Sequence, residues 1–223
     1  MTVLYTFIVL LVGYILGSIP FGVIIVWLVA KRDVRKFGSG RTGGTNVMRA
    51  AGFLAGLLTG VMDVLKGLAT GYLADLLLPG NTLVKVFAVA LVILGQIHSV
   101  FLMERDEKNR IQLRGGAGGA AALGAAAALW GPVWMFIVPI GVFVFLVVGY
   151  ASLTTVSIAL VGLGVFTYRY FAGLGPWQHI LFGGIALALV CWALRPNFQR
   201  LANGTERTVG LRALIESRRN KKG

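Results

Sequence analysis

Charged residues are scarce in this chain of 223 residues, and acidic residues are the scarcest. Only 13% of the residues are charged, with 8 acidic against 21 basic, while 57% are hydrophobic. The mean hydropathy is +0.82. This leaves too little polar surface to cover a water-soluble globule. The composition therefore excludes a soluble protein and predicts an all-α membrane protein, since helices satisfy their own backbone hydrogen bonds in lipid.

Residues with redox or metal chemistry are also few. The single cysteine, Cys191, excludes an internal disulfide and lies in an apolar run, where packing is its expected role. His98 and His179 stand alone beside predicted interfaces, and no group of His, Cys, Asp and Glu has the spacing of a metal site. No serine-histidine-acid set can be argued either. The sequence predicts neither a metal nor another cofactor.

Long hydrophobic runs recur at the length of a bilayer span, about 20 residues each. The first run has no basic residue before it and no small-residue cleavage site after it, so we interpret it as a span rather than a signal peptide. The runs cover residues 3–30, 54–78, 83–103, 118–130, 133–150, 153–171 and 177–194. The fourth and fifth are separated only by Gly131 and Pro132. We predict about seven transmembrane helices, within a range of five to seven.

The basic residues are concentrated in three segments. Residues 31–49, 105–114 and 195–223 contain 18 of the 21 basic residues. Basic loops favour the cytoplasmic side, and an odd number of spans places all three segments on one side. We therefore predict an external N-terminus, a cytoplasmic C-terminus, one membrane domain over residues 1–194 and a basic cytoplasmic tail over 195–223.

The first basic loop is rich in glycine and hydroxyl groups. It contains Gly38, Ser39, Gly40, Arg41, Thr45 and Asn46, with Lys36 before it and Arg49 after it. Glycine lets backbone N–H groups approach a ligand closely, and hydroxyls and cations add donors and charge. The pattern indicates a phosphate site. The alternative is a flexible surface loop whose basic residues only fix the topology.

The second basic loop ends in a glycine run directly before the fourth hydrophobic run. Its residues are Arg114, Gly115, Gly116, Ala117 and Gly118. A helix that begins there directs free N–H groups and its positive dipole end at an anion. The pattern indicates a second phosphate site, and the alternative is close helix packing through small residues.

One pair of charges lies inside a hydrophobic run. Asp63 and Lys66 are three residues apart and share a helix face. Charges within a span are candidates for function. The alternative is an ion pair that neutralises itself inside the bundle.

Several stretches, in chain order, resemble the bacterial acyl-phosphate:glycerol-3-phosphate acyltransferases. The first signature of that family is similar to residues 17–22, 33–35, 38–40 and 45–49, and its second span to residues 63–67. The second signature is similar to residues 100–102 with 115–116, the start of the sixth span to 150–153, and the third signature to Arg195, Asn197, Arg200 and 203–206.

This resemblance implies an enzyme of the bacterial inner membrane, in the first acylation of phospholipid synthesis. It would transfer a fatty acyl group from acyl phosphate to glycerol 3-phosphate, giving lysophosphatidic acid and phosphate, without a cofactor. Its partners would be these two substrates and membrane lipid, with no nucleic acid. The donor is a mixed anhydride, so positioning and charge stabilisation can suffice without an enzyme nucleophile.

The resemblance and the loop compositions together assign the site residues. Roles in catalysis fall to Ser39, Arg49, Lys66 and Asn197. Phosphate contacts fall to Gly38, Gly40, Arg41, Thr45, Asn46, Arg114, Gly115, Gly116, Gly118 and Ser152. The third signature contributes Arg195, Arg200 and Glu206.

The chain departs from the family pattern at five positions. Ala117 replaces a basic residue, Gln96 and Leu194 replace histidines, Arg41 replaces asparagine and Gly149 replaces an arginine. We predict that Arg114 supplies the cation missing at Ala117, with Arg41 as the alternative source. The departures also keep other functions open: a silent or re-specialised family member, or a transporter or binding protein for a phosphorylated lipid precursor.

Overall fold

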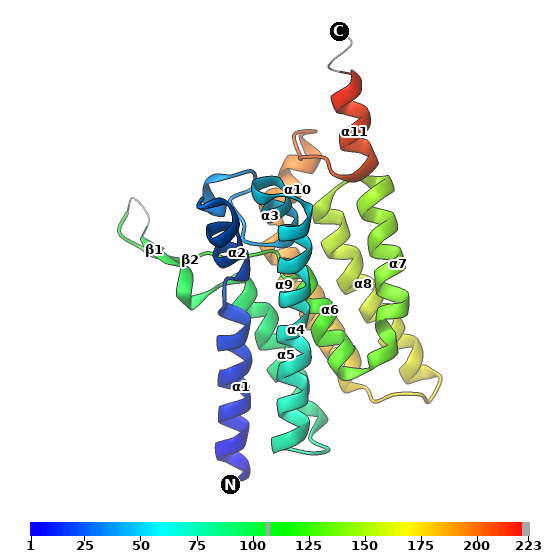
Figure 1. The fold of residues 1–223 in the computed structure, drawn as a ribbon. Helices are drawn as coiled ribbons and strands as arrows, with labels where there is room; N and C mark the ends of the chain where they lie inside the picture. The colour runs from blue at the N-terminus through cyan, green and yellow to red at the C-terminus, as the bar shows by residue number, and fades with distance from the viewer. Residues whose placement is uncertain (106–107, 220–223) are drawn as a thin grey trace.

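The computed structural model describes residues 1–105 and 108–219, and most of the chain is helical (Figure 1). Its α-helices are α1 (Thr2–Ser18), α2 (Phe21–Ala30), α3 (Gly44–Ala51), α4 (Phe53–Leu77), α5 (Thr82–Ile97), α6 (Gly119–Leu129), α7 (Trp134–Phe143), α8 (Ala151–Phe171), α9 (Gln178–Ala193), α10 (Arg195–Ala202) and α11 (Gly210–Arg219). Short helical turns are η1 (Val34–Lys36), η2 (Val100–Leu102), η3 (Gly131–Val133) and the π-helical η4 (Val144–Val148). Strands β1 (Met103–Arg105) and β2 (Ile111–Leu113) form an antiparallel hairpin, with Arg105 opposite Ile111.

The predicted all-α membrane fold is confirmed. Within the described residues, five helical segments are long and apolar enough to cross a bilayer, and their residues are Thr2–Ala30, Phe53–Leu77, Thr82–Leu102, Gly131–Val148 and Ala151–Phe171. A sixth is possible if α9 and α10, which meet at a bend of 61°, count as one span. The total of seven spans and their orientation stay predictions.

The predicted span 118–130 differs from the other runs in length. It forms only α6, with 11 residues, which at 1.5 Å per residue is about 16 Å. The hydrocarbon core is about 30 Å thick. Alanine and glycine make this segment apolar enough to resemble a span, yet the helix covers only about half of the bilayer.

The first hydrophobic run is interrupted near its middle. Pro20 has no N–H group, and the helical ladder stops at Ser18 and resumes at Phe21. The interruption frees backbone carbonyls that a continuous helix would use. Two of them, of Gly17 and Ile19, accept hydrogen bonds from the Lys66 ammonium at 3.2 and 2.6 Å.

Small residues allow the central helices to pack closely. Gly67 of α4 lies against Gly124 and Ala125 of α6, where a Cβ on Gly67 would lie 3.0 Å from the Ala125 Cα. Such contacts are typical of helix pairs in lipid. The apolar core beside them is formed by α5, α6, α8 and α9 and includes Ile93 and Phe166.

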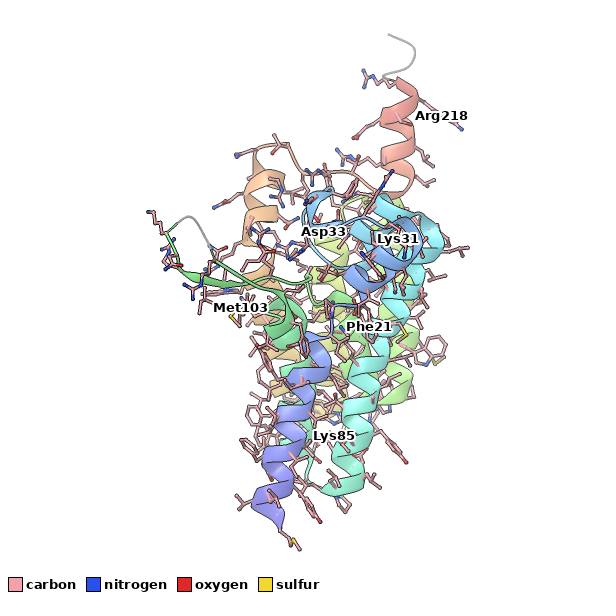
Figure 2. The ribbon with its side chains drawn as sticks, turned by 60° about the vertical axis from the view of Figure 1, so that its left-hand side comes forward. Phe21, Lys31, Asp33, Lys85, Met103 and Arg218 are labelled. Atoms are coloured by element: carbon pink, nitrogen blue, oxygen red, sulfur yellow. The ribbon has the colours of Figure 1, made fainter. Side chains whose placement is uncertain are left out.

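The polar loops gather at one end of the bundle. Figure 1 shows α2, α3, α10 and α11 at the end opposite the N-terminus. In Figure 2, Lys31, Asp33 and Arg218 lie in that half, while Lys85 lies toward the other end. The described parts of the first and third basic segments therefore lie at the same end of the bundle.

Candidate active site

A cavity of about 490 Å³ lies where these loops meet the helices. Its walls include the loop before α3, the first turns of α3, α6 and α8, the middle of α4, and residues of α10 and the segment after it. The predicted site residues that line it are Ser39, Arg41, Thr45, Asn46, Arg49, Gly118, Ser152, Asn197, Arg200 and Glu206. Those outside its walls are Gly38, Gly40, Lys66, Arg114, Gly115, Gly116 and Arg195.

Three helix N-termini converge on the cavity. The N-cap residues are Gly43 for α3, Gly118 for α6 and Tyr150 for α8, and none of the three makes a side-chain capping hydrogen bond. The residues that follow each N-cap line the cavity. Free N–H groups and three positive dipole ends therefore face one space, which favours a bound anion.

Asn46 organises the first glycine loop. Its side chain is buried, and its amide nitrogen donates to the carbonyls of Val34, Phe37 and Arg41 at 3.1, 3.0 and 2.8 Å. Its oxygen accepts from the Ser39 N–H at 3.0 Å. These bonds satisfy four backbone groups of the loop and fix the position of Ser39 at the cavity wall.

Two glycines predicted as phosphate contacts have another role. Gly38 and Gly40 have φ values of +50° and +71°, in the left-handed region that side chains disfavour. A Cβ on Gly38 would also collide with the Asn46 oxygen. These residues shape the loop and lie behind the cavity wall, so the predicted direct contact does not match their position.

Arg41 connects three segments of the site. Its guanidinium donates to the carbonyls of Gly116, at 3.4 Å, and Ala193, and to the side-chain oxygen of Asn197 at 3.1 Å. Burial lowers the pKa of Arg41, and the nearby Arg200 lowers it further. A cation that is partly desolvated in this way interacts strongly with an anion that enters the cavity.

The third signature forms a hydrogen-bonded network behind Arg41. The Asn197 amide donates to Glu206 Oε1 at 2.8 Å, and Arg200 Nε donates to Glu206 Oε2 at 3.1 Å. Both ends of the Asn197 side chain are therefore occupied by protein groups. Arg195 lies outside the network, with its guanidinium 3.7 Å from the ring centre of Trp192.

Four arginines line the cavity: Arg41, Arg49, Arg200 and Arg207. Burial and the neighbouring Arg207 lower the pKa of Arg49, whose guanidinium donates to the Thr208 carbonyl at 3.3 Å. In the sequence, Arg207 is one basic residue of the tail among several, and only its position directly after Glu206 of the third signature indicates a place in the site.

The second glycine loop contributes backbone rather than charge. Gly116 N–H donates to the Gln96 carbonyl at 2.7 Å, and a Cβ on Gly115 would lie 2.5 Å from the Ile97 carbonyl oxygen. Both glycines allow close packing against the end of α5. Of the predicted glycines in this loop, Gly118 alone lines the cavity.

The position of Arg114 does not match its predicted role. Its side chain is half exposed and pairs with Glu104 at 2.8 Å, on the outer side of the loop. Arg41, in contrast, lies in the cavity and donates to the carbonyl of Gly116, the residue before Ala117. The geometry therefore favours Arg41 over Arg114 as the cation near Ala117.

A buried polar cluster lies at the α4 side of the cavity. Lys66 pairs with Asp63 at 2.8 Å, and the Gln96 amide bridges them by donating to Asp63 at 2.8 Å and accepting from Lys66 at 2.5 Å. Asp63 and Gln96 line the cavity, whereas Lys66 lies behind them. The location of Lys66 fits the interior ion pair rather than direct contact with a substrate.

Ser152 projects a free hydroxyl at the first turn of α8. The residue is buried and lines the cavity, and its Oγ has no hydrogen-bond partner among the residues that the structure describes. Buried hydroxyls are normally paired. An unpaired one beside a helix N-terminus is suited to a ligand oxygen.

Four of the five departures from the family pattern meet in this cavity. Arg41, Gln96, Ala117 and Leu194 line it. Ala117 and Leu194 belong to one apolar cluster with Val190. One wall of the cavity is therefore apolar at two positions where the family has a basic residue or histidine, and the Arg41 guanidinium lies beside them, bonded to the carbonyls of Gly116 and Ala193.

The cavity also has an apolar side toward lipid. Leu57, Val61 and Leu65 of α4 line it and are about half exposed on the outer surface of the bundle. Leu123 of α6 and Ile158 of α8 line it as well. A ligand with a polar head and an aliphatic chain fits this arrangement of surfaces.

The fold and the cavity define a helical membrane protein whose basic, loop-bounded site adjoins lipid-facing helices. A family model described as glycerol-3-phosphate acyltransferase matches residues 7–204. The chain belongs to the glycerol-3-phosphate acyltransferase family.

Individual relatives agree with this assignment. The chain is 38% identical over 204 residues to a glycerol-3-phosphate acyltransferase of Rubrobacter xylanophilus, covering 91% of this chain and 94% of the relative. It is 34% identical over 207 residues to glycerol-3-phosphate acyltransferase 2 of Moorella thermoacetica, covering 92% and 97%.

Solved structures show the same fold. The crystal structure of PlsY, an integral membrane glycerol 3-phosphate acyltransferase, in its glycerol 3-phosphate form is similar with a TM-score of 0.79 and 29% identity, covering 94% of this chain and 98% of that one. Its lysophosphatidic acid form gives a TM-score of 0.78.

Proposed function

We propose that this protein transfers a fatty acyl group from acyl phosphate to glycerol 3-phosphate, giving lysophosphatidic acid and phosphate. The observation that carries the proposal is the cavity itself, in which arginines and three uncapped helix N-termini adjoin an apolar wall toward lipid. Both substrates carry phosphate, and the donor and product carry an aliphatic chain. Family membership and the two ligand-named PlsY structures support the same reaction.

The reaction needs no covalent enzyme intermediate. The glycerol 3-phosphate hydroxyl oxygen bonds to the acyl carbon, the bond from that carbon to the phosphate oxygen breaks, and the phosphate leaves with the electron pair and takes up the hydroxyl proton. The protein holds both phosphates and stabilises the developing negative charge. Ser39, Arg49 and the first turn of α3 serve one wall of the site, and Ser152 and the first turn of α8 serve the other.

Arg41 supplies the cation that Ala117 lacks. Its guanidinium is fixed by carbonyls and by Asn197, and it lies beside Gly116 in the second glycine loop. Arg200 and Glu206 hold Asn197 from the other side. The positive charge beside the second glycine loop is thus supplied by Arg41, a residue of the first loop.

We propose the inner membrane of a bacterium as the location, with the cavity on the cytoplasmic side. The position of α2, α3, α10 and α11, which belong to or adjoin the first and third basic segments, at one end of the bundle supports this orientation. Acyl phosphate then enters with its chain between lipid-facing α4 and α8, and glycerol 3-phosphate arrives from the cytoplasm.

A direct assay tests the reaction. Purified protein in nanodiscs receives acyl phosphate and labelled glycerol 3-phosphate, and lysophosphatidic acid is quantified against the Ser39→Ala, Arg49→Ala double variant. We expect product from the wild type and little from the variant. Absence of product from the wild type, under conditions in which a relative is active, would contradict the proposal.

The second candidate is a re-specialised member of the family, which the apolar residues Ala117 and Leu194 in the cavity favour. Such a protein would acylate another hydroxyl compound or only bind the donor. The same assay with Ala117→Lys distinguishes the two: activity gained only in that variant would identify a chain that has left the family reaction.

A further inference from the structure

Helix α11 lies beyond the region that the family model matches, and one of its faces is apolar and uncovered. The family match ends at residue 204, whereas α11 covers Gly210–Arg219. Leu211, Leu214 and Ile215 occupy one helix face and are 52%, 58% and 66% exposed. A free helix in water gains nothing from such a face, so a partner surface is expected.

The same helix is basic at its outer end. Arg218 lies at that end in Figure 2, and Arg219 follows it. Glu216, the one acidic residue of α11, is engaged by the Thr208 hydroxyl at 2.7 Å and by Arg212 at 3.3 Å, and the Thr208 hydrogen bond lowers the pKa of Glu216. The charges that remain for a partner are therefore positive.

The apolar face of α11 continues a surface that already faces lipid. Leu211 and Ile215 share a shallow groove with Val147, which is 54% exposed and belongs to the membrane segment Gly131–Val148. Gly210, the first residue of α11, packs against this segment, and a Cβ on it would lie 2.7 Å from the Leu146 Cα. This packing holds the start of α11 at the edge of the membrane segment.

The segment before α11 lines part of the cavity, through Glu206 and Arg207. Thr208 forms a β-bridge with Tyr150, and Val209 N–H donates to the Gly149 carbonyl at 2.9 Å. The Thr208 carbonyl also accepts from Arg49 at 3.3 Å. A partner that binds α11 would therefore also restrain Thr208, which contacts Arg49 at the cavity wall.

We propose that α11 binds the anionic phospholipid surface of the leaflet next to the cavity. Leu211, Leu214 and Ile215 enter the boundary between headgroups and acyl chains, and Arg218 and Arg219 meet the headgroups. An amphipathic basic helix favours this location, and its binding depends on anionic lipid. Binding of α11 to a second copy of the chain or to a soluble protein would not depend on anionic lipid. The proposal does not depend on the acyltransferase reaction.

Fluorescence of a labelled tail tests the proposal. The native Cys191 is replaced by serine, Ser217→Cys carries an environment-sensitive dye, and the protein is placed at one copy per nanodisc of zwitterionic or partly anionic phospholipid. We expect a blue-shifted, brighter signal in the anionic discs, weakened by high salt because screening shortens electrostatic reach. Equal signals in both lipids would refute the proposal.

Two sets of variants separate the contribution of the basic residues from that of the apolar face. Arg218→Glu with Arg219→Glu should lower the ratio of bound to free helix by on the order of 30-fold or more, since each arginine near an anionic surface contributes about fivefold. Leu214→Ser with Ile215→Ser should abolish the shift in both lipids. Leu174→Ser, which changes a residue that is 59% exposed between α8 and α9, should leave it unchanged.

Self-association is the remaining outcome. A shift that depends on two copies per disc and not on lipid charge would show that α11 meets a second chain, and it would overturn the lipid proposal.

Discussion

The two glycine-rich loops differ in how they build a binding wall. The first loop brings its own charge and is held rigid by Asn46, which bonds to four of its backbone groups. The second loop brings backbone and close packing, and its arginine, Arg114, faces outward to Glu104. In the proposed phosphate site, the cation beside the second glycine loop therefore comes from the first loop.

Removing the shared cation should produce the largest effect. Arg41→Ala removes three hydrogen bonds and the positive charge beside Gly116. A charge-assisted contact is worth roughly 1.5 to 3 kcal/mol, so we expect kcat/KM to fall by about 100-fold or more. Initial rates of lysophosphatidic acid formation measure the change.

The matched control is Arg114→Ala, which should alter kcat/KM by less than about threefold, as expected for an exposed ion pair. Arg41→Ala combined with Ala117→Lys should recover part of the activity, because a cation returns to the second loop. The opposite pattern, a harmless Arg41→Ala and a damaging Arg114→Ala, would return the role to the second loop's own arginine.

Arg49 tests the charge that belongs to the first loop alone. Arg49→Ala should lower kcat/KM by roughly 10-fold to 100-fold, through loss of one charge-assisted phosphate contact. Arg207→Ala should cost less, because this side chain is exposed. Steady-state kinetics with both substrates give the values. Unchanged turnover and unchanged KM in Arg49→Ala would exclude its role.

Hydropathy predicted most of the fold because long apolar runs have few alternatives in lipid. Hydropathy did not predict that α6 is much shorter than the other helices, since it reports how apolar a segment is and not how long a helix it forms. The break in the helix at Pro20 can be predicted from the sequence, because proline lacks the N–H group that a helix needs. The hydrogen bonds from Lys66 to the freed carbonyls cannot be predicted in this way, because Lys66 is distant in sequence.

Motifs predicted several residues that line the cavity, but not the direction of each side chain. Lys66 and Arg195 belong to matching stretches and Arg114 stands directly before one, yet each has a partner outside the cavity: Asp63 for Lys66, the Trp192 ring for Arg195 and Glu104 for Arg114. Sequence spacing determines which residues are neighbours along a helix. The partner of each of these side chains depends instead on which residue the packing of the fold brings close to it. Arg207 illustrates the reverse case, a cavity residue outside the quoted motifs.

The glycines of the second loop should be sensitive to volume rather than to charge. A Cβ on Gly115 would collide with the backbone oxygen of Gln96 and lie 2.5 Å from that of Ile97, whereas a Cβ on Gly116 would lie 3.0 Å from the Gln96 side-chain nitrogen. We expect Gly115→Ala to destabilise the protein by about 1 to 3 kcal/mol. Gly116→Ala should cost less. Thermal unfolding in detergent measures both, and equal effects would contradict the packing explanation.

The smallest effect concerns a surface chain of ion pairs that joins the two loops. Arg35 pairs with Asp33 at 2.8 Å and with Glu104 at 2.5 Å, and Glu104 also pairs with Arg114. The hydrogen bond from Arg35 lowers the pKa of Asp33. A carboxyl whose pKa is lower in the folded state stabilises the protein above its unfolded pKa, and the contribution is lost as the pH falls through the folded value.

Asp33→Asn should therefore lower the thermal midpoint at pH 7, and the difference from wild type should shrink as the pH falls below about 4. The expected cost at pH 7 is below about 1 kcal/mol, because the Asp33 and Arg35 side chains are each 28% exposed and the pair is screened. Asp75→Asn, which breaks the pair with Lys85 at 2.6 Å near the other end of the bundle, is the control for a general loss of negative charge. Thermal unfolding of both variants and the wild type is measured from pH 3 to pH 8, at low and at high salt. A difference for Asp33→Asn that persists at pH 3 would show that its carboxylate charge is not what links the loops.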